Sequence, residues 1–597
     1  MQQKTRQQAD PRYTWRLEDI YPSNERWEED FHATQQALPS LAALSGTLDS
    51  PKGLLAALRA IEKLGRACEA LFTYAKMRRD EDNGNGLYQA MTDRAMGLLV
   101  RFESEKAFFS PELMQLGSAK VRSFLAQEPG LAGYRRYLEK ELWLEKHTLS
   151  PEQEKLLAAA GELTAAPDTI YSMLADADLR FPVIRDEQGQ EVEITHGRYI
   201  PLLESRDRRV RKDAYEGLYS TYKAFSNTIA AAYAASVKGD QFYAQARGYG
   251  SALEASLYPN AIPVAVYDSL VEAVHRHLPA LHAYVALRKK ALGLDKIHYY
   301  DLYTPIAPEA ELGVPYERAA QIVQEGLKPL GETYLKDLSQ AFTDGWVDVY
   351  ENQGKTSGAY SWGVYGVHPY VLLNYNQNLD SIYTLAHELG HAMHSFYSDR
   401  NQPYSCAGYP LFLAEIASTT NEALLQAHML KTLTDRKNQM ALYNHELEQI
   451  RGTVFRQTMF AEFERKAHEL AAAGESLTRE RLNQIYAELN TLYYGPDMVM
   501  DDFIPYEWMR IPHFYRAYYV YQYATGYSAA VAFSRSILGG GQAERDRYLS
   551  FLAAGDSKNP LDILRDAGLD MEKPQAVESC MRSFEEALAA LTRLMEA

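Results

Sequence analysis

Helical spacing of apolar residues runs through most of the chain and limits the folds open to it. Between residues 204 and 248, Leu218, Tyr222, Phe225 and Ile229 recur three and four positions apart, as on one face of a helix. The same spacing predicts further helices over residues 264–292, 436–473 and 576–595. We therefore predict a mainly α fold, with a large helical body.

Two segments break this pattern. Residues 181–195 place a polar, glycine-containing turn between β-rich flanks, which predicts a hairpin. Residues 297–376 are richer in aromatic residues, valine and glycine, and predict a small β-sheet just before residue 387. The helical N-terminal region is expected to end near residue 200, although no linker-like stretch marks that boundary.

Charge and apolar run length exclude some function classes. The 597 residues include 79 acidic and 62 basic side chains, a formal net charge of −17, which disfavours general binding of nucleic acid. No window approaches 18 uninterrupted apolar residues, so we expect no membrane span. The N-terminal residues lead straight into polar sequence and lack the apolar stretch of a secretory signal.

The cysteines indicate the redox setting. Cys68, Cys406 and Cys580 form no CxxC pair, and so sparse and odd a set argues against a disulfide framework. We therefore predict a reducing, cytoplasmic location.

The segment His387-Glu388-Leu389-Gly390-His391 predicts a metal site. It lies in an apolar helical pattern for which Asp380 and Ser381 offer N-caps. On a helix, His387 and His391 project from one face, as two nitrogen ligands to one zinc require. Glu388 can reach a water on that metal and is predicted to act as the general base.

A catalytic zinc needs a third protein ligand, and two residues are candidates. His394 follows His391 by three positions, but one straight helix does not easily close three ligands around a tetrahedral ion. Glu415 opens a second predicted helix and closes the site without strain, so we favour it. His394 then becomes a neighbour of the site.

Two acidic residues are candidates to orient a ligand imidazole. Glu422 lies two turns beyond Glu415 on the same helix face and can accept a hydrogen bond from the ring. Asp380 is a competing orienter, with a simple N-cap as its alternative role. Gly390 costs about 1 kcal/mol relative to alanine inside a helix. We therefore expect another backbone, or the substrate, to approach it closely.

Around these residues the sequence resembles the thimet oligopeptidase family of metallopeptidases, and within it the oligoendopeptidase F group. The resemblance extends over nearly the full chain. Its motifs are HELGHAMH at 387–394, FLAEIASTTNEALL at 412–425, GAYSWGVYGVHPYVLLNY at 358–375, YYGPDMVMDDFIPYEWMRIPHFYRAYYVYQYATGY at 493–527 and WRLEDIYPSNERWEEDF at 15–31.

The resemblance implies a helical body divided by a deep substrate channel, with one Zn²⁺ per chain at its floor. Residues 1–200 would form a channel wall or lid, and residues 201–597 the catalytic domain. The family cleaves oligopeptides internally, because only a flexible chain reaches the metal. Its third ligand is a glutamate about 25 residues beyond the histidines, and Glu415 lies 24 residues after His391.

The resemblance also implies groups that contact the substrate. Family members stabilise the tetrahedral intermediate with a histidine and tyrosines from a C-terminal helix. His513 and Tyr527 match best here. The spacing leaves open which of the tyrosines between them faces the metal: Tyr518, Tyr519, Tyr521 or Tyr523. Tyr518 and Tyr519 are predicted to bind the substrate.

Residues 358–370 resemble the family's substrate-binding edge. Gly358, Gly363 and Gly366, with Tyr360 between them, would let a peptide backbone approach and pair as an added strand. The alternative is a mobile loop.

The leading prediction is a zinc endopeptidase acting on oligopeptides, with no nucleic-acid or membrane partner. A zinc carboxypeptidase is the alternative enzyme, because the same architecture can accept a free C-terminus. A peptide-binding protein with a degenerate site is the non-enzymatic alternative. The sequence leaves the oligomeric state open.

Overall fold

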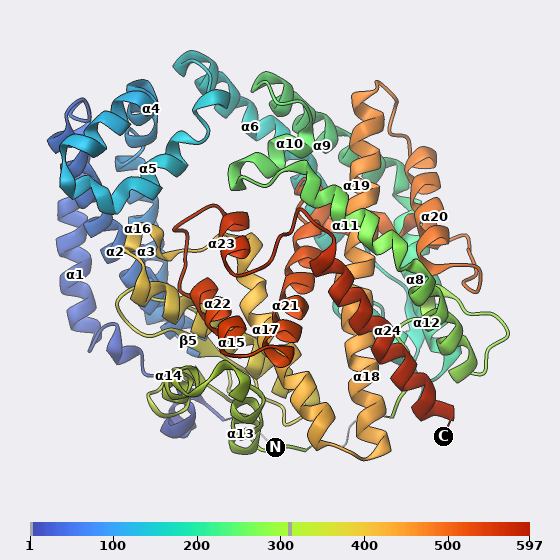
Figure 1. Ribbon diagram of the computed structural model, residues 1–597. Coiled ribbons are helices and arrows are strands. Elements are labelled where there is room, and N and C mark those ends of the chain that lie inside the picture. The colour runs from blue at the N-terminus through green and yellow to red at the C-terminus, as the bar shows by residue number, and fades with distance from the viewer. Residues whose placement is uncertain (1–3, 309–312, 597) are drawn as a thin grey trace. The chain divides into compact units, whose positions relative to one another are not determined.

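A computed structural model describes residues 4–308 and 313–596 of the chain. Nearly all of its secondary structure is helical and its two sheets are small, which confirms the mainly α prediction (Figure 1). Among the described residues, no helix is both long enough and apolar enough to cross a membrane.

The chain divides into two compact units, each assembled from three stretches of sequence. Unit 1 comprises Met1–Lys146, Glu311–Met429 and Phe533–Leu569, and unit 2 comprises His147–Ala310, Leu430–Ala532 and Asp570–Ala597. Residues from both sides of position 200 therefore contribute to unit 2. The division into domains 1–200 and 201–597 stays a prediction, as does the deep channel.

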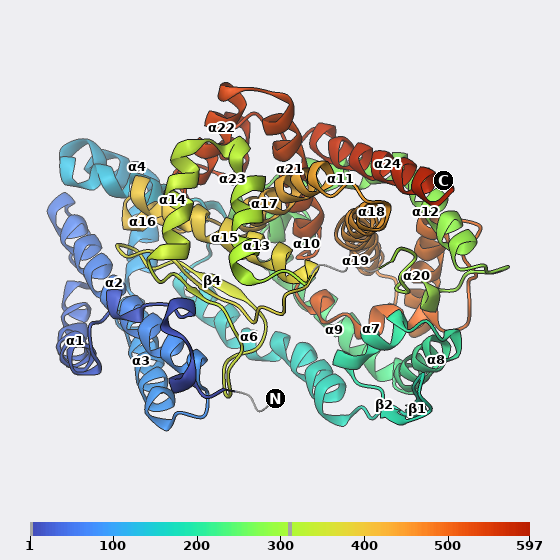
Figure 2. The same cartoon turned by 90° about the horizontal axis from the view of Figure 1, so that it is seen from below.

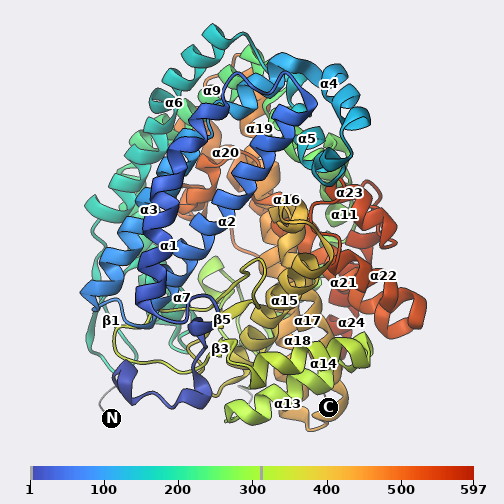
Figure 3. The same cartoon turned by 90° about the vertical axis from the view of Figure 1, so that its left-hand side faces the viewer.

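Unit 1 contains the HELGH segment. Figure 3 shows three of its N-terminal helices, α1, α2 and α3, side by side. The helices of this unit are α1 (Asn24–Ala37), α2 (Pro51–Glu81), α3 (Gly86–Glu105), α4 (Phe109–Gln127), α5 (Arg135–Leu142), α13 (Tyr316–Gly326), α14 (Glu332–Thr343), α15 (Leu379–Asn401), α16 (Tyr404–Ala407), α17 (Leu411–Thr432, through Met429), α22 (Gln542–Leu552) and α23 (Pro560–Asp566).

The predicted small sheet also lies in unit 1 and is confirmed. Strands β3 (Val347–Asp348), β4 (Tyr360–Trp362) and β5 (Tyr370–Leu372) have the order β3-β5-β4, with β3 parallel and β4 antiparallel to β5. Tyr370 and Leu372 enter a core shared with α1–α3. Residues 309–312 of the predicted sheet segment lie outside the described residues.

Unit 2 contains the second group of predicted site residues. The hairpin predicted at residues 181–195 is confirmed as β1 (Val183–Arg185) and β2 (Glu191–Glu193), which Figure 2 shows beside α8. The helices are α6 (Pro151–Ser172), α7 (His196–Glu204), α8 (Arg208–Ala224), α9 (Ser226–Ala246), α10 (Ala252–Leu257), α11 (Val264–Arg276), α12 (Leu278–Ala291), α18 (Arg436–Ile450), α19 (Arg456–Ala472), α20 (Arg479–Tyr494), α21 (Tyr521–Gly539, through Ala532) and α24 (Gln575–Glu596).

The long predicted helices are divided at identifiable points. Residues 204–248 form α8 and α9, which meet at Phe225, where ψ is 12°. Residues 264–292 form α11 and α12, with Pro279 in the first turn of α12. Residues 436–473 form α18 and α19, joined by a turn of π-helix over Arg451–Phe455. Such turns occur often at functional sites.

The N-cap prediction for the metal-site helix is wrong. Helix α15 begins at Leu379, and its N-cap is Asn378, whose side chain accepts from the Ser381 backbone N–H. The Ser381 hydroxyl instead accepts from the Asn376 backbone N–H at 3.0 Å. Asn is as good a cap as Asp, and it directly precedes the first helical residue. Asp380 lies in the first turn and is exposed.

Candidate functional site

Helices α15 and α17 touch backbone to backbone at Gly390. A β-carbon placed on Gly390 would lie 2.5 Å from Ser418 Cα and 2.8 Å from Ala417 O, far inside van der Waals contact. The expected close approach of another backbone is therefore present, and the partner is α17. Because Ser418 lies less than one turn after Glu415, this contact sets the distance between Glu415 and the histidines.

The structure brings His387, His391 and Glu415 together and leaves His394 apart. Glu415 Oε2 lies 3.4 Å from His387 Nε2 and 3.5 Å from His391 Nε2. One donor atom from each of the three residues lies within 4.8 Å of the other two. Among the described residues, this trio is the only such group of histidine, cysteine and carboxylate side chains.

Two of the three proposed ligands, His387 and Glu415, are held by a second contact. Glu422 Oε1 accepts a hydrogen bond from His387 Nδ1, which leaves His387 Nε2 turned toward Glu415. The Ser418 hydroxyl lies 3.2 Å from Glu415 Oε2 and donates to it. Asn421 Nδ2 donates to the Ala386 carbonyl at 3.1 Å and so joins α17 to α15 one residue before His387. Such contacts fix the direction in which a ligand presents its donor atom.

The charges in the trio favour binding of a cation. Burial opposes protonation of His387, but hydrogen bonds to Glu415 and Glu422 outweigh it and raise its pKa to about 10. Hydrogen bonds from the same two histidines hold the pKa of Glu415 well below its usual range. Burial raises the pKa of Glu388, whose side chain is 8% exposed beside the trio, while the two histidines oppose that shift.

The distances also fit a tetrahedral metal ion. Zinc binds imidazole nitrogen and carboxylate oxygen at about 2.0–2.2 Å, so tetrahedral ligands lie about 3.3–3.6 Å from one another. The two nitrogen–oxygen distances in the trio, 3.4 and 3.5 Å, fall in that range. Two imidazoles and one carboxylate are also the donor set that zinc commonly takes.

His394 and Asp380 lie apart from the trio. The His394 ring stacks on Tyr409 at 3.7 Å, is 1% exposed, and has a pKa that burial lowers to about 3. His394 is therefore a neutral packing residue of α15 in this structure. Asp380 lies about two turns before His387, and the Nδ1 atom of His387 already contacts Glu422.

The glycine-rich segment borders an edge strand. β4 has a neighbouring strand, β5, on one side only within the described sheet. Gly358 and Gly366 have φ angles of +81° and +87°, a conformation that favours glycine. A β-carbon on Gly363 would lie 2.9 Å from Ser395 Cβ, so this glycine packs against α15. The Tyr360 hydroxyl donates to Asp80 at 2.7 Å, so this side chain already has a protein partner. The backbone of β4 is the part that could pair with an added strand.

In unit 2, His513 forms a ring cluster with two of the four candidate tyrosines. His513 lies exposed in a 3₁₀-helix, Pro512–Tyr515. Its ring stacks with Tyr519 at 5.9 Å and meets Tyr523 edge-on at 6.1 Å. The Tyr523 hydroxyl donates to that of Tyr519 at 3.4 Å. Tyr527 follows Tyr523 by one turn of α21.

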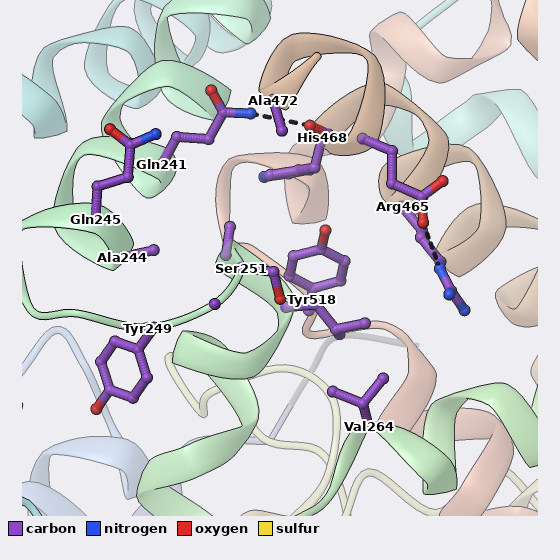
Figure 4. A pocket seen from close by; sticks show the side chains of 14 residues that line it. Gln241, Ala244, Gln245, Tyr249, Ser251, Val264, Arg465, His468, Ala472 and Tyr518 are labelled. Carbon is purple, nitrogen blue, oxygen red and sulfur yellow. Dashed lines mark hydrogen bonds and ion pairs between the residues drawn. The ribbon is translucent and has the colours of Figure 1, made fainter.

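The other two tyrosines are buried. Tyr518 and Tyr521 are each 3% exposed and pack against Tyr267. Tyr518 lines a cavity of about 220 Å³, and Figure 4 shows its ring beside His468. This burial supports the packing role for Tyr518 more than the predicted contact with substrate.

A buried carboxyl group holds the chain between His513 and Tyr523. Tyr518 has a φ of +54°, which is unusual for a residue with a side chain. Its backbone N–H donates to Glu464 Oε1 at 2.6 Å. Glu464 is fully buried, and burial raises its pKa far above the usual value. At this left-handed residue the two consecutive tyrosines have different neighbours: Tyr518 packs against Tyr267, and Tyr519 packs against His513.

Tyr523, and Glu464 on α19, which binds this segment, were not singled out by the sequence. Tyr523 was one of four equal candidates, because the helix α21 begins only at Tyr521 and the spacing before it is irregular. Glu464 lies in an ordinary helical pattern, and its only signal was a carboxylate among apolar neighbours such as Phe460, Phe463 and Ala467.

Family models match most of the chain. A model described as "Peptidase family M3" matches residues 201–583, and one described as "Oligopeptidase F" matches residues 112–181. The chain is 47% identical to Oligopeptidase PepF of Bacillus subtilis over 98% of this chain and 87% of that protein. It is 42% identical to Group B oligopeptidase PepB of Streptococcus agalactiae over 99% of this chain and 98% of that protein.

Solved structures are similar over almost the whole length. The oligoendopeptidase-F from Enterococcus faecium has a TM-score of 0.75 at 38% identity, covering 96% of this chain and 99% of that chain. A solved protein of Chlamydophila abortus has a TM-score of 0.94 at 36% identity, covering 99% of this chain and 100% of that chain.

Proposed function

Because the chain belongs to peptidase family M3 and is therefore a peptidase, we propose that it is a zinc-dependent endopeptidase that hydrolyses internal bonds of short, unstructured oligopeptides. The names of its relatives, oligopeptidase and oligoendopeptidase, support both the substrate class and the internal position of cleavage.

His387, His391 and Glu415 would hold one Zn²⁺, and Glu422 would fix the orientation of the first imidazole. Bound there, zinc supplies Lewis-acid polarisation and makes water a stronger nucleophile near neutral pH. Glu388 has the position of a general base: it is next in sequence to a ligand, lies buried beside the trio, and could take a proton from the attacking water.

His513, Tyr519, Tyr523 and Tyr527 are proposed to contact the substrate. Their hydroxyl and imidazole groups can donate hydrogen bonds to the oxygen on which charge develops as the carbonyl carbon becomes tetrahedral. Tyr523 and Tyr519 already lie around His513, which supports their joint action. The free edge of β4 can pair with the backbone of an extended peptide, which gives affinity with little side-chain preference.

The convergence of two imidazole nitrogens and one carboxylate oxygen, with a buried glutamate beside them, is the observation that carries this proposal. Its metal part is tested by titrating the metal-free protein with Zn²⁺. We expect one tight equivalent, and less than about half an equivalent would contradict the site as described.

Peptides blocked at both ends test the endopeptidase activity. An endopeptidase cleaves them internally, whereas a carboxypeptidase needs a free C-terminus. Internal fragments identified by mass spectrometry are the expected result, and no cleavage at any peptide concentration would favour the carboxypeptidase alternative. The non-catalytic alternative is set aside, because the family is one of peptidases.

A cytoplasmic location and the absence of nucleic-acid and membrane partners stay predictions. Cys68, Cys406 and Cys580 are all buried and form no disulfide within the described part of the chain, which is compatible with a reducing compartment.

A further inference from the structure

One face of the edge strand β4 carries two aromatic side chains that the metal site does not use. Tyr360 and Trp362 lie two positions apart in β4, so they project from the same face of the sheet. Both rings are only partly buried against the core that contains α1–α3. We use "aromatic face" for these two rings together with Phe72 and Lys76 of α2, which lie against them.

Helix α2 holds the aromatic face in place. Phe72, Lys76 and Asp80 follow one another at intervals of four residues, so they lie along one side of the helix. The Phe72 ring lies 6.3 Å from that of Trp362. Lys76 Nζ lies 4.9 Å from the centre of the Tyr360 ring and 5.3 Å from that of Trp362. These contacts, with the hydrogen bond from the Tyr360 hydroxyl to Asp80, stabilise both rings in one arrangement.

The opposite face of β4 is turned toward the metal-site helix. Ser361 and Gly363 alternate with the two aromatic residues, and a β-carbon on Gly363 would lie 2.9 Å from Ser395 Cβ in α15. The residues of β5 that pair with Tyr360 and Trp362 enter the core shared with α1–α3. One face of β4 therefore belongs to α15, and the other is the aromatic face.

The backbone of β4 is available for pairing along one edge. Beyond its antiparallel ladder with β5, residues 360–362 bond to no other backbone group within the described part of the chain. A peptide added at this edge continues the sheet, and its side chains point alternately to the two faces. Peptide residues directly opposite Tyr360 and Trp362 place their β-carbons about 4.5–5.5 Å from those residues. Every second peptide residue therefore meets the aromatic face.

Trp362 has more capacity for a ligand than Tyr360. The Tyr360 ring also lies 6.3 Å from that of Trp15, and its hydroxyl is bound to Asp80. Among the described residues, the indole N–H of Trp362 meets no protein acceptor, and it is not sealed from solvent. A large apolar ring with an unused donor at its rim suits a peptide, which brings both apolar side chains and carbonyl oxygens.

We propose that the aromatic face is a subsite for an aromatic side chain of the peptide substrate, and that Trp362 determines this preference. The proposal rests on the endopeptidase function, and on the pairing of substrate with β4, proposed above. Aromatic rings attract one another in offset-stacked and edge-to-face arrangements, and each buries a large apolar area. Backbone pairing accepts any side chain, whereas the aromatic face adds a preference at alternate positions.

The subsite predicts a spacing between the aromatic residue and the bond that is cleaved. The aromatic face and the proposed metal ligands both lie in unit 1, and β4 packs against α15. The number of peptide residues between the ring and the cleaved bond is therefore set by the fold of this unit. An aromatic residue opposite Tyr360 and one opposite Trp362 give two spacings that differ by two residues. At the intervening spacing the same side chain points toward α15 instead.

Mapping of cleavage sites tests this period of two. Doubly blocked peptides of alanine, serine and glutamine, each with one phenylalanine at a different position, are digested and the cleaved bonds identified by mass spectrometry. We expect cleavage at one spacing from phenylalanine, or at two that differ by two residues. The intervening bond should be cleaved at least about threefold less. Cleavage spread evenly over neighbouring bonds, or strongest at two adjacent spacings, overturns the proposal.

Variants assign the preference to Trp362. Trp362→Ala should bring the ratio of cleavage at preferred and intervening bonds close to one, and Trp362→Phe should retain most of it. Trp362→Leu, which keeps an apolar side chain against the core, takes the place of the alanine variant if that does not fold. The matched control is Trp143→Ala, since Trp143 is 40% exposed at the end of α5, outside the aromatic face. A wild-type ratio without the Trp362 ring, or an equal loss in the control, contradicts the proposal.

The two proposals fail in different ways. If the subsite is wrong, doubly blocked peptides are still cleaved internally, but the spacing from phenylalanine is not constant or does not depend on Trp362. If the endopeptidase function is wrong, the wild-type protein cleaves no doubly blocked peptide. Binding of a fluorescent phenylalanine peptide then tests the aromatic face by itself: Trp362→Ala should bind it at least about threefold more weakly than Trp143→Ala, and equal affinities contradict the subsite.

Discussion

The two groups of candidate site residues are held in different ways. In unit 1, the ligands lie inside two long helices, α15 and α17, whose backbones touch at Gly390. In unit 2, His513 and Tyr519 lie in 3₁₀ and irregular chain, and ring packing places Tyr523 beside them. The unit 1 group is fixed by backbone contact, and the unit 2 group by side chains and one buried carboxyl.

This difference corresponds to two chemical demands. A metal ion tolerates only a few tenths of an ångström of error in ligand position, which rigid helices supply. Donors to a substrate must instead adapt to peptides of different sequence, and less regular segments permit that. Substitutions of the unit 1 residues that hold or position the ligands should therefore affect metal binding, and those in the unit 2 group should affect turnover and KM with the metal retained.

The largest effect is expected from Glu388→Gln. It removes the proposed base but no ligand, so kcat should fall about 10²- to 10⁴-fold while one metal per chain remains. Elemental analysis and peptide hydrolysis measure the two quantities. Loss of the metal would show that Glu388 acts in holding the site, and near-normal turnover would contradict its role as base.

Tyr523→Phe should have the next largest effect. It removes a hydroxyl next to His513, and loss of one donor to a developing oxyanion typically costs about 10²-fold in kcat. Tyr521→Phe is the control, because Tyr521 is buried against Tyr267 and should change kcat little. Equal losses in both variants would mean that the ring cluster does not single out Tyr523.

Gly390→Ala tests whether backbone contact sets the ligand distances. The added methyl group would meet Ser418 Cα at 2.5 Å and push α17 away from α15. We expect zinc affinity to fall about 10- to 100-fold, as for other changes in residues that support ligands. Competition with a chelator measures it. Gly97→Ala in α3 is the control, since a β-carbon there meets nothing within 4 Å. Unchanged zinc affinity in Gly390→Ala would show that the backbone contact does not set the ligand distances.

Glu464→Leu should lower kcat about tenfold by releasing the Tyr518 backbone N–H. Glu464→Gln retains an acceptor oxygen and should recover most of the activity. Metal content should remain one per chain in both variants. If Leu and Gln reduce kcat equally, or only thermal stability changes, Glu464 does not position the tyrosine segment.

The smallest expected effect is on the titration of His513. Its pKa should lie below the ordinary value of about 6.5. Because the positive charge of Arg456 disfavours imidazolium, Arg456→Gln should raise the pKa of His513 toward that value. Proton–carbon NMR spectra of labelled histidine measure both. A pKa that is unchanged in the variant would show that Arg456 and His513 are not coupled.

The sequence alone predicted the helical class, the hairpin at 181–195 and the small sheet, because apolar spacing and turn residues act locally. It also selected Glu415 over His394 as the companion of the two histidines, since one helix cannot direct three ligands at one point. These features depend on the spacing of residues along one helix or strand, and that spacing can be read from the sequence.

Other features depend on contacts between distant residues. The N-cap of α15 was missed because Asn378, Asp380 and Ser381 are all good caps, and only the path of the irregular chain before the helix decides among them. The roles of Tyr518 and Tyr523 follow from a left-handed residue stabilised by Glu464, 54 positions earlier in the chain.

The edge strand β4 has a further consequence for how the molecule behaves among its own copies. An open strand edge is a template on which another protein chain can polymerise. Here the strand is only three residues long, and Gly358 and Gly366, on either side of it, have left-handed backbone conformations that do not continue a strand. An edge that short is a poor nucleus for a sheet between molecules, yet it can still bind a few residues of a passing peptide. We therefore expect the shortness of this strand to limit self-association at high protein concentration.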